Sequence, residues 1–569
     1  MMSRTVMKLA ALTALSSLSL VACASGEDAT TSNSASSDTS KTAAKAGVND
    51  TPDEDINAHP RDDLKDGGTL TSSLGEFSEQ QNVFNVDAMI YTTQVWKWYN
   101  PQMVLFTADG EAKPNESYIT GWSADVENGN TVVTYDLNEK AKFNDDTPID
   151  WKAFETTWII NRGDSEDYAP NNTDGYEQIK SVEPGTSDKQ VKVTFDGIYP
   201  WWEGLFIFIA HPALKDPNNY NDYLNKLHPE WGAGPYTVED VDYKKGEVVF
   251  KRNDKWWGNP GKLDKRIFRQ LEVKAAINAY RNGELDNVSA ASREAYSAVK
   301  DEPNTQVRIS QRSRNSLLTL NSAAPALNDV KVRKAIATAI DRELMSKIQT
   351  KGLPFEEPTP PGSLALFRFQ EGYNDNFAEA TTFSVEESKK ILDEAGWVEG
   401  ADGYREKDGK PLELRYVYFS DSEAAKADAT AIQKLLKDVG VKLDLVNRPG
   451  SDFSSVIKND DFDILPIAFT ADSPFGMATL GQLYMSTSDF NDSGTGTPEI
   501  DQMIRDMQKL PTAEEQIAAG NKVEAAAFKE FGYIPMFNGA NIEAVRTDLA
   551  NFGPSAFGAY PIEDIGWLK

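Results

Sequence analysis

The sequence has one cysteine, three histidines and a deficit of basic side chains. Lys and Arg number 58 against 88 Asp and Glu, which gives a formal charge of −30. This balance disfavours a nucleic-acid-binding surface, because affinity for phosphate backbones depends on clustered positive charge. Cys23 has no partner for an intrachain disulfide. The fold must therefore depend on burial of a hydrophobic core, for which 569 residues are ample.

Signatures of catalysis are also scarce. None of His59, His211 and His228 is paired at a metal-ligand spacing, and G-x-S-x-G, P-loop and dinucleotide-binding fingerprints are missing. Close acidic pairs always occur among 88 acids, so a carboxylate-dependent hydrolase stays open as an alternative. Nothing in the sequence points to catalysis, so we expect no enzyme activity, no metal and no other cofactor.

The N-terminal residues are typical of an export signal. Arg4 and Lys8 precede an apolar run over residues 9–22 that contains no acidic residue. This run is shorter than the roughly 20 apolar residues of a spanning helix, so residues 1–22 are predicted to be a cleaved signal peptide. Residues 23–65 begin with a stretch rich in Ser, Thr, Ala and Asp, which predicts a flexible tether.

The end of the signal, Leu20-Val21-Ala22-Cys23, resembles a lipobox. The resemblance implies that Cys23 carries a diacylglyceryl thioether and often an N-acyl chain such as palmitate. Two or three chains anchor a protein where one binds only marginally. The alternative is a chance cysteine in the apolar run.

From about residue 67 onward the pattern is that of a mixed α/β protein with two or more lobes. Residues 133–137 and 191–195 alternate between apolar and polar, as strands do. Asp329 can cap a helix whose apolar stripe is Val332, Ile336, Ile340 and Leu344. Ser384 and Glu387 form a capping box, and Gly396 is placed as a C′ glycine.

Several segments, in order, resemble the family 5 extracellular solute-binding proteins, in particular an actinobacterial lipoprotein branch. Residues 142–149 resemble F-x-D-G-x-P, with Asp146 at the usual glycine. Residues 232–236 resemble G-T-G-P-Y, and residues 250–258 resemble R-N-x-x-Y-W-G. Residues 325–342 resemble P-L-x-D-x-R-V-R-x-A-I followed by A-I-D-R.

The resemblance implies a two-lobed periplasmic-binding-protein type II (Venus-flytrap) α/β fold with an extra inserted subdomain. Lobe I would take residues 66–85, 181–310 and 541–569. The inserted subdomain would take residues 86–180, and lobe II residues 311–540. Two crossing segments would join the lobes, so that a ligand closes them.

The resemblance also implies a function. Such proteins capture oligopeptides or similar small solutes and deliver them to the permease and ATPase subunits of an ABC importer. We expect a monomer that is lipid-anchored at the extracytoplasmic face of the cell membrane. No nucleic acid is expected as a partner.

A ligand contact is expected in the segment from Phe469 through Ala471 and Asp472 to Pro474, which resembles the family's W-x-A-D-x-x-x-P loop. The resemblance implies that Asp472 receives the α-ammonium of a peptide. An ammonium buried in a cleft needs such a counter-charge, because an unpaired buried charge costs several kcal/mol. The alternative is a solvated or helix-capping aspartate.

Trp96 and Trp98 are weaker candidates for the cleft wall, because they lie where the inserted subdomain begins. Core packing is the alternative for each of them, since ligand pockets are few per protein. Trp256 and Trp257 lie in the element that resembles R-N-x-x-Y-W-G, and we expect them to pack in the core.

A second hypothesis is a member that has lost import. The long tether, Pro358-Thr359-Pro360-Pro361 and the departures from the peptide motif also resemble a branch from mycolate-bearing bacteria. One member of that branch is associated with phosphatidylinositol mannoside synthesis. The chain would then act in cell-envelope lipoglycan synthesis.

Overall fold

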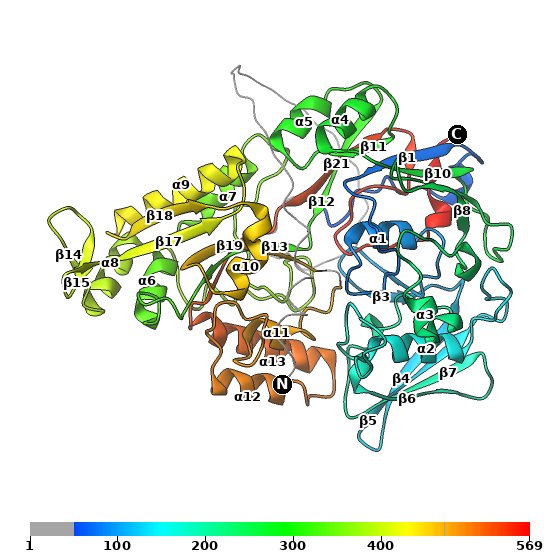
Figure 1. Cartoon of the computed structure of the whole chain (residues 1–569), viewed down its shortest axis with the longest axis horizontal. Coiled ribbons are helices and arrows are strands. Elements are labelled where there is room, and N and C mark those ends of the chain that lie inside the picture. Colours follow the sequence, from blue (N-terminus) through cyan, green and yellow to red (C-terminus); the bar gives the residue numbers. More distant parts are fainter. Residues whose placement is uncertain (1–50, 472) are drawn as a thin grey trace, which may run out of the picture.

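The computed structural model describes residues 51–471 and 473–569 (Figure 1). The predicted signal peptide, Cys23, most of the predicted tether and Asp472 lie outside the described residues. Within the described residues, no helix is both long and apolar enough to pass through a bilayer. The chain is a mixed α/β protein with two lobes, to the right and left in Figure 1, and a subdomain below the right-hand lobe.

Lobe I contains two sheets. The first has the order β1-β10-β9-β8, with β1 parallel to β10 and the other pairs antiparallel. Its strands are β1 (Thr69–Leu74), β8 (Tyr236–Asp242), β9 (Glu247–Arg252) and β10 (Lys265–Gln270). The second has the order β11-β21-β12, formed by β11 (Asn287–Ser289), β12 (Thr305–Gln311) and β21 (Ala540–Arg546). The C-terminal part of the chain therefore returns to lobe I through β21.

Short helices and pairs surround these sheets. They are α1 (Ile90–Trp96), α4 (Val273–Arg281), α5 (Arg293–Val299) and the pair β22 (Leu549–Ala550) and β23 (Gly566–Trp567). The short helix α3 (Pro217–Tyr220) lies beside α2 (Trp151–Asn161) in Figure 1. Residues 51–65, the last part of the predicted tether 23–65, are hydrogen-bonded to this lobe. Gln311 N donates to Pro52 O at 2.8 Å, and Asp55 N donates to Pro554 O at 2.9 Å.

The subdomain is an antiparallel sheet with the order β4-β5-β7-β6. Its elements are β4 (Ile119–Glu127), β5 (Asn130–Leu137), β6 (Ile179–Pro184), β7 (Gln190–Phe195), α2 (Trp151–Asn161) and the hairpin β2 (Val104–Phe106) with β3 (Ala112–Pro114). The strands predicted at 133–137 and 191–195 are confirmed within β5 and β7. A domain boundary at residue 180 falls inside β6, which pairs with β7 of the same sheet.

Lobe II is built on a five-stranded sheet with the order β18-β17-β19-β13-β20. Its strands are β13 (Arg314–Leu320), β17 (Glu413–Tyr418), β18 (Lys442–Asn447), β19 (Ile464–Thr470) and β20 (Tyr533–Phe537). Its helices are α6 (Val330–Ala339), α7 (Arg342–Thr350), α8 (Val385–Glu394), α9 (Glu423–Asp438), α10 (Phe453–Lys458), α11 (Leu480–Tyr484), α12 (Pro498–Met507) and α13 (Ala513–Phe528). A small sheet consists of β14 (Val398–Glu399), β15 (Arg405–Lys407) and β16 (Lys410–Pro411).

The predicted helix caps are present in lobe II. Asp329 Oδ1 accepts the N–H of Lys331 at 2.9 Å and starts α6. Ser384 Oγ accepts the N–H of Glu387 at 3.1 Å at the start of α8, and Gly396 follows that helix with φ +85°. These side-chain bonds satisfy backbone donors that a helix end would otherwise leave unpaired.

The predicted apolar stripe from Val332 to Leu344 is wrong as one helix. α6 ends at Ala339, and Asp341 Oδ1 accepts the N–H of Leu344 at 2.9 Å as the cap of α7. Leu344 is consequently 42 % exposed. A second capping aspartate inside an apolar repeat is a stop signal that the four-residue spacing alone does not reveal.

Asp146 occupies the turn before α2 with φ +72°. It therefore keeps the left-handed conformation for which glycine is usual, and aspartate is among the few side chains that tolerate it. Its carboxylate lies 2.5 Å from Lys142 Nζ and 3.1 Å from Lys255 Nζ. α2 then begins at Trp151, as predicted, with Asp150 as its cap.

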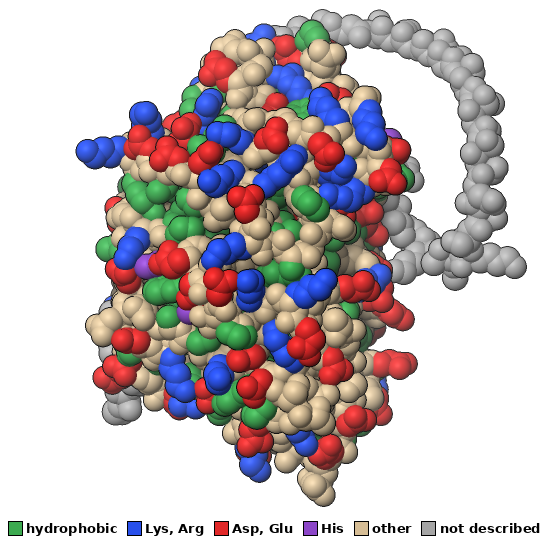
Figure 2. All heavy atoms as spheres, turned by 90° about the vertical axis from the view of Figure 1, so that its right-hand side faces the viewer, with side chains coloured by type: hydrophobic (Ala, Val, Ile, Leu, Met, Phe, Trp, Pro, Cys, Tyr) green, Lys and Arg blue, Asp and Glu red, His purple; other side chains and the backbone are tan. Residues whose placement is uncertain are grey.

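The outer face of lobe I and the subdomain has no single-sign patch. Figure 2 shows basic and acidic side chains interspersed over the described residues of this face. The deficit of basic residues is thus not concentrated in an acidic patch on this face, as expected of a solvated exterior.

Candidate functional site

Two short segments connect the sheet of lobe II to the β11-β21-β12 sheet of lobe I. Arg312 and Ser313 connect β12 to β13, and Asn538 and Gly539 connect β20 to β21. These are the two crossings expected between the lobes, and they lie at the centre of Figure 1. If the lobes move relative to each other, the backbone dihedral angles of these residues must change.

Side chains fasten the two crossings to each other. Asn538 Nδ2 donates to Arg314 O at 2.7 Å and to Asn315 Oδ1 at 2.6 Å. The buried Glu357 carboxylate accepts the N–H of Asn538 at 3.0 Å and of Gly539 at 2.8 Å. Burial raises the pKa of Glu357, against the lowering effect of these two N–H donors. The crossings therefore form one hydrogen-bonded unit.

The segment predicted to contact ligand lies beside the first crossing. Phe469 pairs with Asn315 in the antiparallel ladder of β19 and β13, and its ring is partly buried. Ala471 N donates to Ser313 O at 2.9 Å, which extends this ladder into the crossing. Asp472 follows Ala471 in the sequence and lies outside the described residues.

Two arginines at the first crossing were not singled out from the sequence. Burial, together with a smaller effect of the nearby Arg314 charge, lowers the pKa of Arg312 to about 10. Burial also lowers the pKa of Arg314, whose Nε is buried without a hydrogen-bond partner in the described structure. The only sequence signal was a run of polar residues, 311–315, between two apolar strands.

Beyond this segment, Phe475 brings lobe II into contact with the subdomain side. Its ring centroid lies 6.1 Å from that of Phe106 and 6.1 Å from that of Trp201. Gly204 leaves room for it, since a Cβ there would lie 2.7 Å from Phe475 Cδ2. A Cβ added at Gly110 would likewise lie 2.5 Å from Pro474 Cβ. We call this set the Phe475 contact.

A buried hydrogen bond accompanies the Phe475 contact. Trp201 Nε1 donates to Gln516 Oε1 at 2.7 Å, and the two side chains belong to different lobes of the structure. Nearby, Gln482 of α11 donates to Asp174 Oδ2. The described conformation is thus one in which the lobes touch.

The structure places Trp96 and Trp98 in the core. Each is 2 % exposed. Trp96 packs against Phe84 and Tyr223 with ring centroids 5.7 Å and 5.8 Å away. Trp98 packs against Tyr236 at 5.3 Å and carries the Arg266 guanidinium 5.0 Å from its ring. This burial favours the packing alternative in the described conformation, because Trp96 at the end of α1 and Trp98 in the turn after it both contact other buried aromatic rings.

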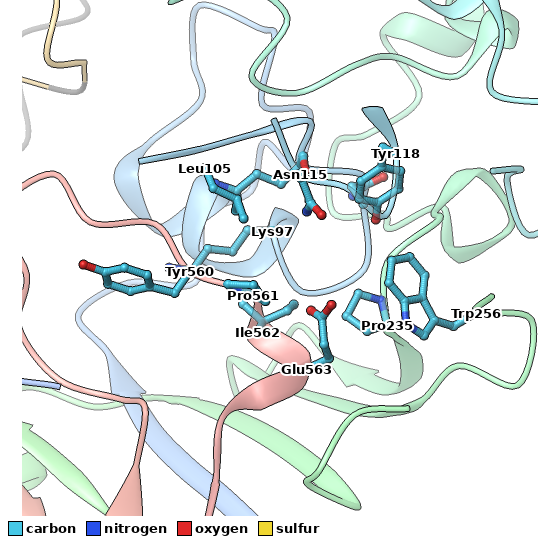
Figure 3. Close-up of a pocket in the computed structure, with 12 residues that line it drawn as sticks. Lys97, Leu105, Asn115, Tyr118, Pro235, Trp256, Tyr560, Pro561, Ile562 and Glu563 are labelled. Atoms are coloured by element: carbon cyan, nitrogen blue, oxygen red, sulfur yellow. Dashed lines mark hydrogen bonds between the residues drawn. The ribbon is translucent and has the colours of Figure 1, made fainter. Parts of the chain in front are cut away.

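A small cavity between lobe I and the subdomain lies away from the crossings. Figure 3 shows Lys97, Tyr118, Trp256 and Glu563 around it. Its volume is about 10 Å³, which is room for about one water molecule. Burial raises the pKa of Glu563 to about 7 and lowers the pKa of Lys97. The cavity is too small for an organic ligand. A shallow hollow of about 390 Å³ lies beside Trp257 and Asn259.

The histidines of the described residues have structural surroundings. His211 Nε2 lies 3.2 Å from Asp145 Oδ2, and burial lowers the pKa of His211. His228 stacks on Trp231 with ring centroids 4.0 Å apart. Over the described ranges, no cluster of three or more His, Cys, Asp or Glu side chains could hold a metal ion.

Comparison with known proteins decides the family. The model described as "Bacterial extracellular solute-binding proteins, family 5 Middle" matches residues 113–491, more than half of the 569-residue chain. The chain belongs to this family. The family 5 resemblance seen in the motifs is therefore confirmed.

Two relatives from Mycobacterium tuberculosis match to different extents. The oligopeptide-binding protein OppA is 28% identical over 524 residues, which cover 90% of this chain and 87% of OppA. The probable monoacyl phosphatidylinositol tetramannoside-binding protein LpqW is 29% identical over 350 residues, 56% of this chain and 54% of LpqW. Both relatives are named as binding proteins.

Solved structures agree with the two-lobed fold. The periplasmic EDTA-binding protein EppA aligns with a TM-score of 0.81 and 25% identity, over 89% of this chain and 97% of EppA. The oligopeptide-binding protein AppA from Bacillus subtilis, in complex with a nonapeptide, aligns with a TM-score of 0.66 and 17% identity, over 89% of this chain and 100% of AppA. The type II solute-binding fold is thus established for this chain.

Proposed function

We propose that this family 5 solute-binding protein captures oligopeptides outside the cytoplasm and delivers them to an ABC permease and its ATPase. The observation that carries the proposal is the match to OppA, which spans 90% of this chain and 87% of OppA. The two crossings and the Phe475 contact support the proposal, because capture requires two lobes that are joined by short segments and can touch.

Ligand would lie between the lobes, over the crossings and beside residues 469–475. An extended peptide held through its backbone leaves its side chains free, so many sequences would bind. Asp472 would receive the α-ammonium, with Phe469 and Ala471 beside it. Trp96 and Trp98 would reach the ligand only if the packing of lobe I changed, since each is 2 % exposed. The relatives' names support binding without chemical conversion of the ligand.

We also propose that the mature protein is a monomer attached by lipid at Cys23 to the extracytoplasmic face of the membrane. The lipobox-like sequence supports this attachment. Two or three acyl chains would hold the body at the surface while the tether lets it reorient toward the permease.

Isothermal titration calorimetry tests peptide capture. A mixed set of peptides of about three to eight residues should give saturable heats, because backbone recognition tolerates sequence. Asp472→Ala should weaken the binding of peptides with a free amino terminus by about tenfold or more. The binding of N-acetylated peptides should weaken much less, since they present no ammonium group to the cleft. No heat with any peptide would reject the function, and equal losses would reject the role of Asp472.

A second candidate is a role in cell-envelope lipoglycan synthesis without import. The match to LpqW favours it, although that match covers only 56% of this chain. A purified protein that binds phosphatidylinositol mannoside and no peptide would support this candidate over the first.

A further inference from the structure

Residues 51–57, which we call the N-terminal strap, lie along the outer edge of β12. The sheet order β11-β21-β12 leaves this edge without a partner among the described strands, and such an edge carries unpaired backbone groups. Gln311 N donates to Pro52 O at 2.8 Å, and Ile309 N donates to Asp55 Oδ2 at 3.1 Å. The strap therefore covers the edge up to the residue that precedes the first crossing.

The other side of the strap pairs with a loop near the C-terminus. Asp55 N donates to Pro554 O at 2.9 Å, and Ala556 N donates to Asp53 O at 2.9 Å. Two further backbone bonds extend this pairing, from Phe552 N to Ile56 O at 2.9 Å and from Asn551 N to Asn57 O at 3.1 Å. The strap thus connects the edge of β12 to this loop, which we call the 551–560 loop.

A glycine in the 551–560 loop permits the strap to approach closely. A Cβ added at Gly553 would lie 2.2 Å from Asp55 O and 3.2 Å from Arg308 Cδ. The oxygen belongs to the backbone of the strap, so it cannot turn aside as the end of a side chain can. Only glycine allows this approach of two backbones, and any side chain at position 553 would push the strap away.

The loop held by the strap carries Phe557 into contact with lobe II. The ring centroid of Phe557 lies 5.8 Å from that of Phe367 and 5.6 Å from that of Phe369. Both of these rings belong to a lobe II segment that is bonded to the Phe475 contact, since Gln370 Nε2 donates to Pro474 O at 2.7 Å. Phe557 therefore adds a second aromatic contact between the lobes.

The hairpin of β2 and β3 holds the same loop from the side opposite the strap. Phe557 N donates to Ala108 O at 3.1 Å, and Ala559 N donates to Phe106 O at 2.9 Å. The ring of Phe106 is one of the two that contact Phe475 of lobe II. The position of Phe557 is therefore fixed by the strap on one side and by the hairpin on the other.

We propose that the N-terminal strap is a conformational brace that favours the conformation in which the lobes touch. It holds the 551–560 loop where Phe557 meets lobe II, and its bond to Gln311 fixes the end of β12 beside the first crossing. A conformation gains population from contacts that form in it alone, and the contacts of Phe557 with lobe II are of this kind. The strap is part of the predicted tether, so one segment would serve both attachment and the setting of the lobes.

Electron paramagnetic resonance distances between two spin labels test the brace in the peptide-free mature chain. Glu183→Cys in the subdomain and Lys509→Cys in lobe II are both exposed and carry the labels, with Cys23→Ser to leave no other thiol. Gly553→Ala should lower the ratio of touching to separated lobes by about two- to tenfold, the value of one lost hydrogen bond. Gly450→Ala, whose Cβ would meet no atom within 4 Å, is the matched control and should change nothing.

Two further variants show whether the strap and Phe557 act together. Replacing residues 51–57 by a Gly-Ser sequence of the same length should lower the ratio as Gly553→Ala does. Adding Gly553→Ala to that replacement should then have no further effect, because the strap no longer occupies the place of the added Cβ. Phe557→Ala should also lower the ratio, and its combination with Gly553→Ala should fall short of the sum of the two effects.

Thermal unfolding of the same variants separates a brace from a purely local structural role. A lower melting temperature with an unchanged distance distribution would overturn the proposal, and so would an equal effect of Gly553→Ala with and without the strap. The strap replacement and Phe557→Ala provide the test even where Gly553→Ala does not fold. Because no peptide is added, the result is independent of the proposed function, which fails by itself if calorimetry finds no peptide binding.

Discussion

Gly204→Ala is expected to impair closure of the two lobes without damaging either lobe. A Cβ at this position would lie 2.7 Å from Phe475 Cδ2, closer than side chains approach one another, and Phe475 belongs to the opposite lobe. Overpacking of this kind costs typically about 1–3 kcal/mol. Because the clash occurs only when the lobes touch, it raises the free energy of that conformation and leaves the open conformation unchanged.

The corresponding loss of affinity can be worked out. If the open form predominates without ligand, destabilising the conformation in which the lobes touch by about 1–3 kcal/mol raises the apparent Kd by about five- to 150-fold. Calorimetry gives the Kd, and small-angle X-ray scattering with and without ligand gives the change in radius of gyration. The thermal unfolding of the ligand-free protein should stay unchanged.

Two further variants make this prediction decisive. Gly450→Ala adds a Cβ where no atom lies within 4 Å, so it should bind like the wild type. Phe475→Ala removes the ring that clashes, so the double variant Gly204→Ala with Phe475→Ala should bind better than Gly204→Ala alone. An unchanged Kd and compactness in Gly204→Ala would refute the view that the Phe475 contact belongs to the ligand-bound state.

Two other predictions concern stability and anchoring. Burial raises the pKa of Asp428 to about 7, and its Oδ1 has no partner among the described residues. Since the folded pKa lies above that of the unfolded chain, the stability of the wild type relative to Asp428→Asn should fall as pH rises from about 4 to about 7, and Asp428→Asn should be the more stable by about 2–4 kcal/mol at pH 8. Denaturant unfolding at several pH values checks this, and parallel pH profiles would contradict it. Cys23→Ser should release the protein from the membrane fraction and abolish incorporation of labelled palmitate, whereas retained labelling would exclude Cys23 as the lipid site.

Local sequence signals predicted much of the fold. Asp329, Ser384 and Gly396 mark helix ends through bonds that form within a few residues, so their roles can be recognised without tertiary information. The prediction of one continuous helix through Leu344 was wrong, because the apolar spacing does not show where one helix ends and the next begins. Asp341 interrupts an apolar repeat by capping a new helix, and the repeat itself looks the same in either case.

The candidate site was less predictable. The segment around Phe469 and Ala471 could be located by family resemblance, and it does lie beside the crossing at Ser313. Arg312 and Arg314 could not be distinguished from other arginines, because lack of a partner is a property of the folded surroundings. For Trp96 and Trp98, position in the sequence suggested a cleft, whereas their burial depends on how α1 and the turn after it pack in the folded protein.

Native mass spectrometry of the mature protein purified from cells tests the central claim most directly. The account predicts a set of added masses that fragmentation resolves into peptides of mixed sequence. Added mass from phosphatidylinositol mannoside in place of peptides, or a protein without ligand that also ignores added peptides, would contradict it.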